Sequence, residues 1–168
     1  MTAIIVERLG AVDVDALRAI RLESLNLHPD CFSADPDIVG AMTTEQWLDG
    51  LSRGIWFGVR KDGALVAIAA LTRPESKKIN HTGELCAMYV RADARGTGIA
   101  DSLIRYIVDV AAEEIDQITV TVNAENKRAI KLYERHGFRI AGRIPRYIRV
   151  GNSLHDELIM VRAVSSSD

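Results

Sequence analysis

A glycine-rich turn in the middle of the chain joins a strand-like segment to a helix-like segment, and this junction most constrains the fold. Residues 83–92 are apolar on both faces of an extended chain, which predicts a central strand. Residues 99–114 are apolar over most of a helical circumference, which predicts a helix packed against a sheet. The turn between them, residues 95–100, has the sequence RGTGIA. This order predicts an α/β arrangement.

The same turn has the properties of an anion-binding site. The first amides of a helix have no partner within the helix, and the helix dipole adds partial positive charge there. Gly96 and Gly98 let the backbone approach an oxygen atom closely, and Arg95 can add a charge-assisted hydrogen bond. The turn is not a P-loop, because no Lys-Ser or Lys-Thr follows Gly98, and Asp101 stands where a dinucleotide fingerprint has its third glycine. A tight turn without a ligand is the alternative interpretation.

The remaining segments predict a mixed α/β fold. Asp62-Gly63 between two apolar runs is typical of a β-hairpin, and Gly151-Asn152 predicts a second one. The predicted strands are residues 2–9, 55–60, 64–73, 117–123, 138–150 and 155–164, and the predicted further helices are residues 13–28, 43–53 and 126–137.

The length and charge of the chain narrow the classes of protein. Its 168 residues predict a single domain, residues 1–164, followed by a flexible tail, residues 165–168. The net charge of −2 argues against a dedicated nucleic-acid-binding protein, which is usually strongly basic. Basic residues gather between Lys127 and Arg149, where they form either a solvated face or a positive field beside an anionic ligand. We therefore expect no nucleic-acid partner.

Cysteine content and hydropathy predict a cytoplasmic protein. Cys31 and Cys86 are the only cysteines and form no CxxC pair, which favours a reducing compartment. The apolar run at the start is too short for a signal peptide, and no segment has the roughly 20 apolar residues that cross a bilayer. No His, Cys and Asp cluster has the spacing of a metal site. We expect no membrane partner and no metal.

Two motifs at a fixed separation give the chain a family resemblance. Residues 95–100 fit R-x-x-G-x-A, and residues 126–138 fit N-x-x-A-x-x-L-Y-E-x-x-G-F. Together with the strand before the turn, residues 83–138 resemble the GNAT superfamily of acyl-CoA-dependent N-acetyltransferases, and the resemblance extends more loosely to both ends. It implies an α/β fold with a central mixed, largely antiparallel sheet that is splayed between its two central parallel strands and flanked by about four helices.

The resemblance also implies which residues hold an acetyl-CoA co-substrate. The amides of residues 95–100 would hold its pyrophosphate, and the preceding strand would pair with its pantetheine arm as an added strand. Asp101 places a carboxylate beside this phosphate site and opposes it unless it points away. The implied cofactor-binding residues are Met88, Tyr89, Val90, Arg95, Gly96, Thr97, Gly98, Ile99, Ala100, Asn126 and Tyr133.

Two residues of the second motif have both a functional and a structural interpretation. By resemblance, Tyr133 lies near the thioester sulfur, where a tyrosine of pKa about 10 can donate to a thiolate whose thiol has a pKa of about 8.5. The alternative is an aromatic core residue on one helix face with Ala129 and Leu132. Asn126 matches an asparagine that contacts the cofactor, and it is equally well placed as a helix N-cap.

A general base is the second catalytic group that the resemblance implies. Deprotonating an amine of pKa about 10.4 at pH 7 costs about 4.6 kcal/mol, whereas an amine of pKa about 7.8 costs only about 1 kcal/mol. Glu84 resembles the position where many members carry this base, and the alternative is a solvated residue at a strand start. Asp156, Glu157 and His155 are further candidates. Cys86 is expected to be a small buried residue rather than a nucleophile.

These residues predict direct transfer of an acetyl group from acetyl-CoA to the primary amine of a small molecule. Phe32 and Tyr147 are the expected acceptor-binding residues and Trp47 is a further candidate, with core or rim positions as the alternative for all three. A protein or peptide amine acceptor and a non-catalytic acyl-CoA-binding module are the other functions that fit. Whether the chain forms a homodimer is left open.

Overall fold

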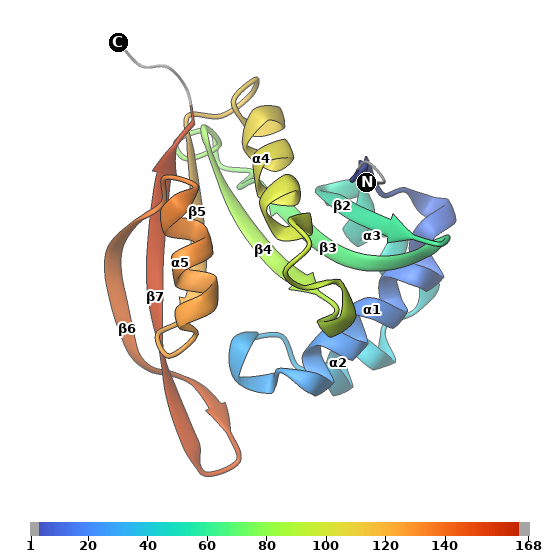
Figure 1. Ribbon diagram of the computed structural model, residues 1–168, viewed down its shortest axis with the longest axis horizontal. Coiled ribbons are helices and arrows are strands. Elements are labelled where there is room, and N and C mark those ends of the chain that lie inside the picture. Colours follow the sequence, from blue (N-terminus) through green and yellow to red (C-terminus); the bar gives the residue numbers. More distant parts are fainter. Residues whose placement is uncertain (1–3, 165–168) are drawn as a thin grey trace.

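A seven-stranded sheet in the order β1-β2-β3-β4-β5-β7-β6 forms the middle layer of the computed structural model, which describes residues 4–164 (Figure 1). All neighbouring strands are antiparallel except β4 and β5, which are parallel. The strands are β1 (Val6–Arg8), β2 (Gly54–Lys61), β3 (Ala64–Thr72), β4 (Thr82–Val90), β5 (Gln117–Asn123), β6 (Arg139–Val150) and β7 (Ser153–Ala163).

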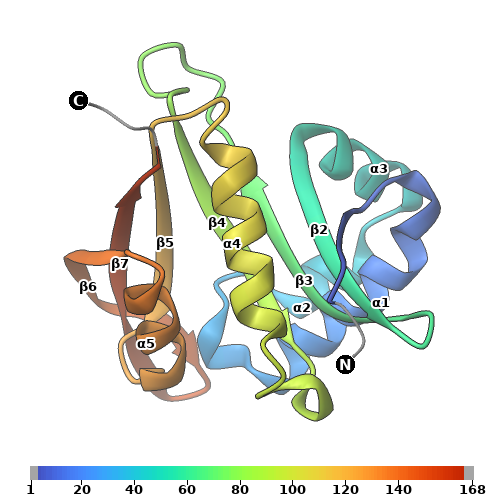
Figure 2. The ribbon, with the colours of Figure 1, turned by 45° about the horizontal axis from the view of Figure 1, so that its top comes forward.

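Helices cover both faces of the sheet. Helices α4 and α5 lie on the face that Figure 1 presents, and α1 and α3 lie on the opposite face (Figure 2). The helices are α1 (Val14–Leu27), α2 (Pro36–Ala41), α3 (Thr44–Arg53), α4 (Ile99–Ala111) and α5 (Lys127–Arg135), with 3₁₀ turns η1 (Ala11–Asp13), η2 (Pro29–Cys31) and η3 (Ala92–Ala94). The predicted mixed α/β sheet is confirmed, with five helices where about four were expected.

Two hydrophobic layers hold these elements together. On one face, Leu103 and Ile107 of α4 pack with Phe57 of β2 in the larger cluster. On the other face, Leu17 of α1 and Trp47 of α3 belong to a second cluster. Burying a side chain of this size stabilises the fold by about 1.5–3 kcal/mol. Trp47 is 5% exposed, so the structure gives it the core position rather than a place in an acceptor site.

Most predicted elements are present, and their turns follow from local chemistry. Asp62 and Gly63 have φ values of +51° and +82°, which suit the two central positions of a hairpin turn. The strand predicted at residues 2–9 is realised as β1, and its first two residues lie outside the described part of the chain. The predicted tail, residues 165–168, also lies outside it.

Helix α2 was not predicted, although its start has a clear signal. Asp35 is the N-cap, and its Oδ1 accepts a hydrogen bond from the amide of Asp37 at 2.8 Å. Pro36 occupies the first helical turn, where its missing N–H has no consequence. The helix has only six residues, which is too short for a hydrophobic period to show.

Candidate active site

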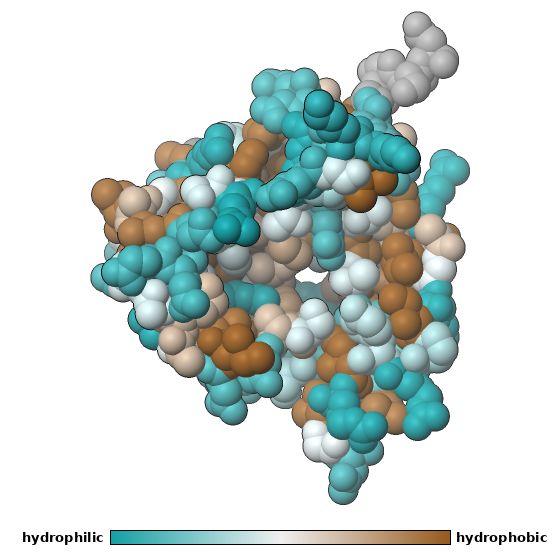
Figure 3. All heavy atoms as spheres, turned by 180° about the vertical axis from the view of Figure 1, so that it is seen from behind, coloured by the Kyte–Doolittle hydropathy of each residue, from teal (hydrophilic) through white to brown (hydrophobic). Residues whose placement is uncertain are grey.

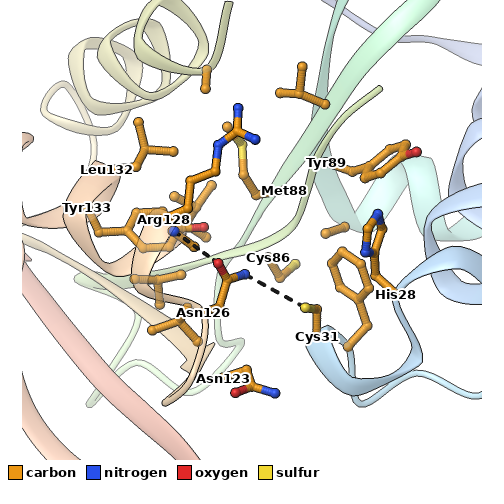
Figure 4. Close-up of a pocket in the computed structure, with 18 of the residues that line it drawn as sticks. His28, Cys31, Cys86, Met88, Tyr89, Asn123, Asn126, Arg128, Leu132 and Tyr133 are labelled. Carbon is orange, nitrogen blue, oxygen red and sulfur yellow. Dashed lines mark hydrogen bonds between the residues drawn. The ribbon is translucent and has the colours of Figure 1, made fainter. Parts of the chain in front are cut away.

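A cavity of about 890 Å³ opens where β4 and β5 separate. Figure 3 shows a hollow at the centre of the face opposite to that in Figure 1. In Figure 4, Arg128, Leu132 and Tyr133 of α5 face His28 and Cys31 across β4. This volume is in the usual range for a small-molecule site, which is about 300–1,000 Å³.

The cavity exists because the two parallel strands pair only where they begin. Thr82–Glu84 of β4 pair with Gln117–Thr119 of β5, and no later residues of these strands pair with each other. Strand β5 remains paired with β7 along its full length. The splay that the resemblance implied is therefore present. The open edge of β4 carries backbone N–H and C=O groups that a ligand amide can satisfy.

A β-bulge bends β4 at the cavity. Ala87 has a φ of +53°, and the register with β3 shifts between Ile68 and Ala70. A left-handed alanine costs about 1–2 kcal/mol, so the surrounding sheet must hold it in place. A bulge bends its strand and changes the direction of the side chains that follow.

The three residues after the bulge were expected to line a pantetheine arm, and all three line the cavity. Met88 points into it (Figure 4). The Tyr89 hydroxyl is directed elsewhere, because it donates to Glu23 of α1 at 2.9 Å. Glu23 also accepts from the Arg91 guanidinium at 2.7 Å, which joins α1 to the end of β4. Val90 and Tyr89 can therefore offer mainly backbone atoms to a ligand.

The glycine turn before α4 presents a run of free amides. Gly96 and Gly98 have φ values of +76° and +84°, which glycine adopts without strain. Among residues 4–164, no acceptor is found for the backbone N–H groups of residues 96–101. The Thr97 hydroxyl does not compete for an anion, because it donates to the carbonyl of Ala94 at 2.6 Å. The predicted anion cradle therefore has the required donors.

Arg95 fastens this turn to β4. Its Nε donates to the Val90 carbonyl at 2.9 Å, and its guanidinium lies 3.1 Å from Nε2 of His28. Neither Ile99, which is buried in the core, nor Thr97 lines the cavity with its side chain. These two residues can therefore offer a ligand only their backbone amides. The members of the turn that line the cavity are Arg95, Gly96, Gly98 and Ala100.

Asp101 does not leave an uncompensated negative charge at the turn. Its carboxylate accepts two hydrogen bonds from Arg135, at 2.7 and 2.8 Å, and lies 2.8 Å from Nε2 of His136. The Arg135 hydrogen bond is the main cause that holds the pKa of Asp101 well below its usual range, and His136 adds to it. Arg135 is the last residue of α5 and His136 is its C-cap, so the end of this helix neutralises the Asp101 charge beside the cradle.

Asn126 is the N-cap of α5, as one of its two interpretations predicts. Its Oδ1 accepts from the amide of Ala129 at 3.1 Å, and its Nδ2 lies 3.7 Å from the Sγ of Cys31 (Figure 4). The residue also lines the cavity, so the cap leaves its predicted contact with a cofactor open.

Tyr133 is both a core residue and a residue of the cavity wall. It is 4% exposed, and its ring lies edge-to-face against Phe138 with centroids 5.6 Å apart. Burial is the main cause that raises the pKa of Tyr133, and the thiols of Cys86 and Cys31 add to it. Its hydroxyl is therefore a proton donor throughout the physiological pH range.

Two carboxylates from different strands line the cavity. Glu84 of β4 is exposed there. Glu157 of β7 is only 2% exposed, and its Oε2 has no hydrogen-bond partner among the described residues. Burial raises the pKa of Glu157, a hydrogen bond from Thr121 partly opposes this, and the Glu84 charge raises it further. Glu157 therefore has the properties of a proton acceptor poised nearer neutral pH than an ordinary carboxylate.

The other candidates on β6 and β7 lie apart from the cavity. Asp156 accepts from the amide of Arg146 at 2.7 Å and pairs with Arg143 at 2.6 Å, and these contacts lower its pKa. Neither Asp156 nor His155 lines the cavity. Tyr147 is 52% exposed and does not line it either, whereas Phe32, the other expected acceptor-binding residue, does.

Several lining residues were not assigned a role from the sequence. Asn123 donates from Nδ2 to the Asp30 carbonyl at 2.8 Å and so ties the segment after α1 to the end of β5. Arg128 belonged to the basic run that was noted without a site. Arg21 and His28 had no signal beyond their place on or after a predicted helix. The cavity joins these residues across long separations in sequence.

The fold and the cavity at the split sheet define an α/β protein with a candidate ligand site, and a family model identifies the class further. Residues 16–138 match the model of the acetyltransferase (GNAT) family, which is more than half of the chain. The protein therefore belongs to the GNAT family of acyltransferases.

Curated relatives agree on the class but differ in their acceptors. An uncharacterized N-acetyltransferase of Mycobacterium tuberculosis is 32% identical over 104 residues, which are 61% of this chain and 63% of that protein. The match thus spans less than two thirds of that relative. Mycothiol acetyltransferase of Beutenbergia cavernae is 33% identical over 68% of this chain and 39% of its own length. The peptidyl-lysine N-acetyltransferase YjaB of Escherichia coli is 32% identical over 34% of this chain and 36% of its own.

Solved structures share the fold. A GNAT-family acetyltransferase from Streptococcus pneumoniae superposes with a TM-score of 0.84 at 22% identity, covering 96% of this chain and 99% of that one. A putative acetyltransferase from Salmonella typhimurium, solved with acetyl-CoA, has a TM-score of 0.81 at 15% identity, covering 99% of this chain and 97% of that one. At these identities the likeness establishes the fold.

Two properties of residues 4–164 concern the expectations about a membrane and a metal. None of their helices combines the length and hydropathy needed to span a membrane. No group of three or more His, Cys, Asp or Glu side chains in this part of the chain is arranged to hold a metal ion.

Proposed function

We propose that residues 1–164 form a single domain that transfers the acetyl group of acetyl-CoA to the primary amine of a small molecule by direct attack. The observation that carries this proposal is that Gly96, Gly98 and Ala100 of the turn, the open edge of β4 and Tyr133 line one cavity. Acetyl-CoA supplies the acetyl group as a thioester. The residues of this chain bind the two substrates, orient them and exchange protons with them.

The donors and charges around the cavity fit such a co-substrate. The amides of residues 96–101, which have no acceptor in the described part of the chain, suit a pyrophosphate, and Arg128 adds positive charge from the facing helix. The open edge of β4 suits the amides of a pantetheine arm. The residues proposed to bind it are Met88, Tyr89, Val90, Arg95, Gly96, Thr97, Gly98, Ile99, Ala100, Asn126 and Tyr133.

Tyr133 is proposed to donate a hydrogen bond to the departing thiolate. Burial keeps its hydroxyl protonated, and the hydroxyl lies at the wall of the same cavity as Met88 on the facing strand. Stabilising charge that develops only as the thioester breaks lowers the barrier rather than strengthening ground-state binding.

Glu84 and Glu157 are the proposed candidates for accepting the amine proton. Glu84 is the residue that the resemblance implies, and it faces the cavity. Glu157 has the stronger physical support, because its free oxygen and raised pKa bring its basicity nearer to that of the amine.

The cysteines support direct transfer over a covalent enzyme intermediate. Burial is the main cause that raises the pKa of both Cys31 and Cys86, in each case to about 11. At pH 7 such a thiol is a thiolate about one part in ten thousand, so it is a poor nucleophile. A Cys86→Ala variant that bound acetyl-CoA yet lost all turnover would contradict direct transfer.

A small acceptor is proposed because the acidic end of the cavity is recessed. Glu157 is 2% exposed, so the acceptor must enter the cavity for its amine to reach the free oxygen, and a small molecule can do so as a whole. A lysine side chain of a peptide or protein is the alternative.

The proposal is tested first by thermal melting with acetyl-CoA, ATP and NAD in parallel. We expect a concentration-dependent rise in Tm with acetyl-CoA alone. Release of coenzyme A thiol is then measured over panels of small amines and lysine peptides. A rise with ATP or NAD but not acetyl-CoA would refute the cofactor assignment. Binding of acetyl-CoA without acetylation of any amine would favour a non-catalytic acyl-CoA-binding module.

A further inference from the structure

The acceptor end of the cavity contains a cation without a counter-ion. Arg21 of α1 lines the cavity, and its guanidinium lies 4.8 Å from the ring centroid of Phe32. No carboxylate among residues 4–164 forms an ion pair with it, and its NH1 has only a long contact of 3.4 Å with the Ser24 hydroxyl. Burial is the main cause that lowers the pKa of Arg21, and the Cys86 thiol partly opposes this. A desolvated guanidinium of this kind favours an anionic partner.

The same end contains an anion without a counter-ion. Glu157 is almost completely buried, and its Oε2 has no partner in the described part of the chain. The charged group that raises its pKa further is the second carboxylate, Glu84, which has the same sign. A buried carboxylate oxygen that is left unpaired is unfavourable unless a ligand supplies the missing donor.

We propose that the acceptor is a zwitterionic amine, whose amino group binds at Glu157 and whose anionic group binds at Arg21 on Phe32. This inference rests on the proposed acetyl transfer and narrows its substrate class to amino acids and similar amines that carry a carboxylate, phosphonate or sulfonate. One such ligand satisfies both unpaired groups at once, whereas a simple amine leaves Arg21 unpaired and a simple anion leaves Glu157 unpaired.

Arg21 belongs to this end of the cavity rather than to the phosphate cradle. Its guanidinium lies over the ring of Phe32, two residues after Asp30. The Asp30 carbonyl accepts from Asn123 of β5, which pairs with Glu157 of β7. The arginine that serves the cradle is Arg95, which bonds to the end of β4 at Val90. The two arginines therefore address different ends of one cavity, and an anion at Arg21 does not compete with a pyrophosphate at the turn.

The test compares each of several zwitterionic amines with an analogue that has the same amine but lacks the anionic group. L-Phenylalanine is compared with phenethylamine, L-histidine with histamine, L-tryptophan with tryptamine, and 2-aminoethylphosphonate with ethylamine. The readout is the ratio of kcat/KM within each pair, measured for the protein as printed in the sequence. We expect the best pair to favour the zwitterion about tenfold or more, since a hydrogen bond to a charged group contributes at least that factor.

Variants assign that preference to Arg21. Arg21→Gln is expected to lower the ratio about tenfold, and Arg21→Lys to restore part of it, since lysine keeps the charge without the planar fork. Arg105→Gln is the matched control, because Arg105 is an exposed arginine of α4 that does not line the cavity. Thermal melts with acetyl-CoA confirm that each variant is folded and binds the co-substrate.

Equal or higher kcat/KM for the amines without an anionic group would overturn the zwitterion proposal alone, as would an Arg21→Gln variant with an unchanged ratio. Preferential acetylation of lysine peptides would overturn it in the same way. Failure to acetylate any amine would instead refute the acetyl transfer on which the inference rests, and the inference would fall with it.

Discussion

Replacing Tyr133 with phenylalanine tests the use of the cavity in catalysis while leaving the core packed. The Tyr133 ring is 4% exposed and lies edge-to-face against Phe138, with the planes at 64°. Phenylalanine keeps this contact and this volume. Among residues 4–164, no hydrogen bond contributes to the raised pKa of the hydroxyl, so the variant loses no partner in this part of the chain. We expect its Tm to stay within about 2 °C of the wild type.

The size of the kinetic effect follows from the acidity of the phenol. Because burial raises the pKa of Tyr133, it is a weaker acid than a thiol of pKa about 8.5, so it hydrogen-bonds the thiolate rather than protonating it fully. A hydrogen bond to a charged group contributes about 1.5–3 kcal/mol, which corresponds to about 10- to 150-fold in rate. We expect kcat to fall by this factor, with the Kd for acetyl-CoA changing by less than about twofold.

The assay follows coenzyme A thiol release from pH 6 to 9. Tyr133 stays protonated over this range, so the ratio of wild-type to variant kcat should not change with pH. Tyr106→Phe is the matched control, because Tyr106 of α4 is 40% exposed, packs edge-on against Phe57 and does not line the cavity. A Tyr133→Phe kcat within about twofold of the wild type would remove Tyr133 from the mechanism.

Three further substitutions test stability and the cradle. Glu157→Gln removes a buried charge and should raise the free energy of unfolding at pH 7 by about 1 kcal/mol. Because folding raises the pKa of Glu157, the cost of its charge is absent below the unfolded pKa of about 4.3, so in urea unfolding the gain should vanish near pH 4. Asp101→Asn breaks the ion pair with Arg135 and should lower the free energy of unfolding by about 0.5–1 kcal/mol in melts at pH 7, since solvent screens an exposed pair. Because folding lowers the pKa of Asp101, the stability that its charge adds is present above about pH 3.8 and is lost as the pH falls. Gly98→Ala should reduce the Tm rise produced by acetyl-CoA more than Gly63→Ala does. The two glycines have similar φ values, +84° and +82°, but Gly63 lies in a distant hairpin. Equal reductions would contradict binding of the pyrophosphate at the turn.

The elements with local signals were predicted to within a few residues. Thr43 caps α3 by a capping box with Gln46, and Gly137 after α5 has a φ of +82°, so both helix boundaries follow from nearby side chains. Strand β5 matches its prediction at both ends, because an unbroken run of β-branched residues from Ile118 to Val122 fills its interior.

The distortion of β4 could not be predicted in this way. Ala87 has no sequence signal for a left-handed conformation, and the bulge depends on its register with β3. The splay from β5 was implied by the family resemblance and not by the residues themselves, because pairing between strands more than thirty residues apart has no local signature.

The residues of the candidate site likewise fall into those with a local sequence signal and those that depend on tertiary contacts. The cradle was predicted, since its glycines, helix start and arginine are contiguous. Glu157 was one of three candidates on its strand, and only tertiary packing distinguishes it: pairing with Asn123 of β5 and Ile144 of β6 places it in the centre of three strands. Arg21 could not be assigned from the sequence, because its proposed role depends on its packing against Phe32 and on its having no carboxylate partner among the described residues.

The open edge of β4 persists because each strand beside it is held by something else. Seven residues of β5 pair with β7, so β5 cannot move toward β4 without giving up an existing ladder. The bulge at Ala87 bends β4, and the Glu23–Arg91 pair fixes its far end to α1. An unpaired edge normally invites pairing with another chain, and here it is recessed between α5 and the segment that Asn123 ties to Asp30. Because these restraints act on both strands, no single one of them is the sole cause of the opening, and the groove is a property of the packed sheet rather than of any one motif.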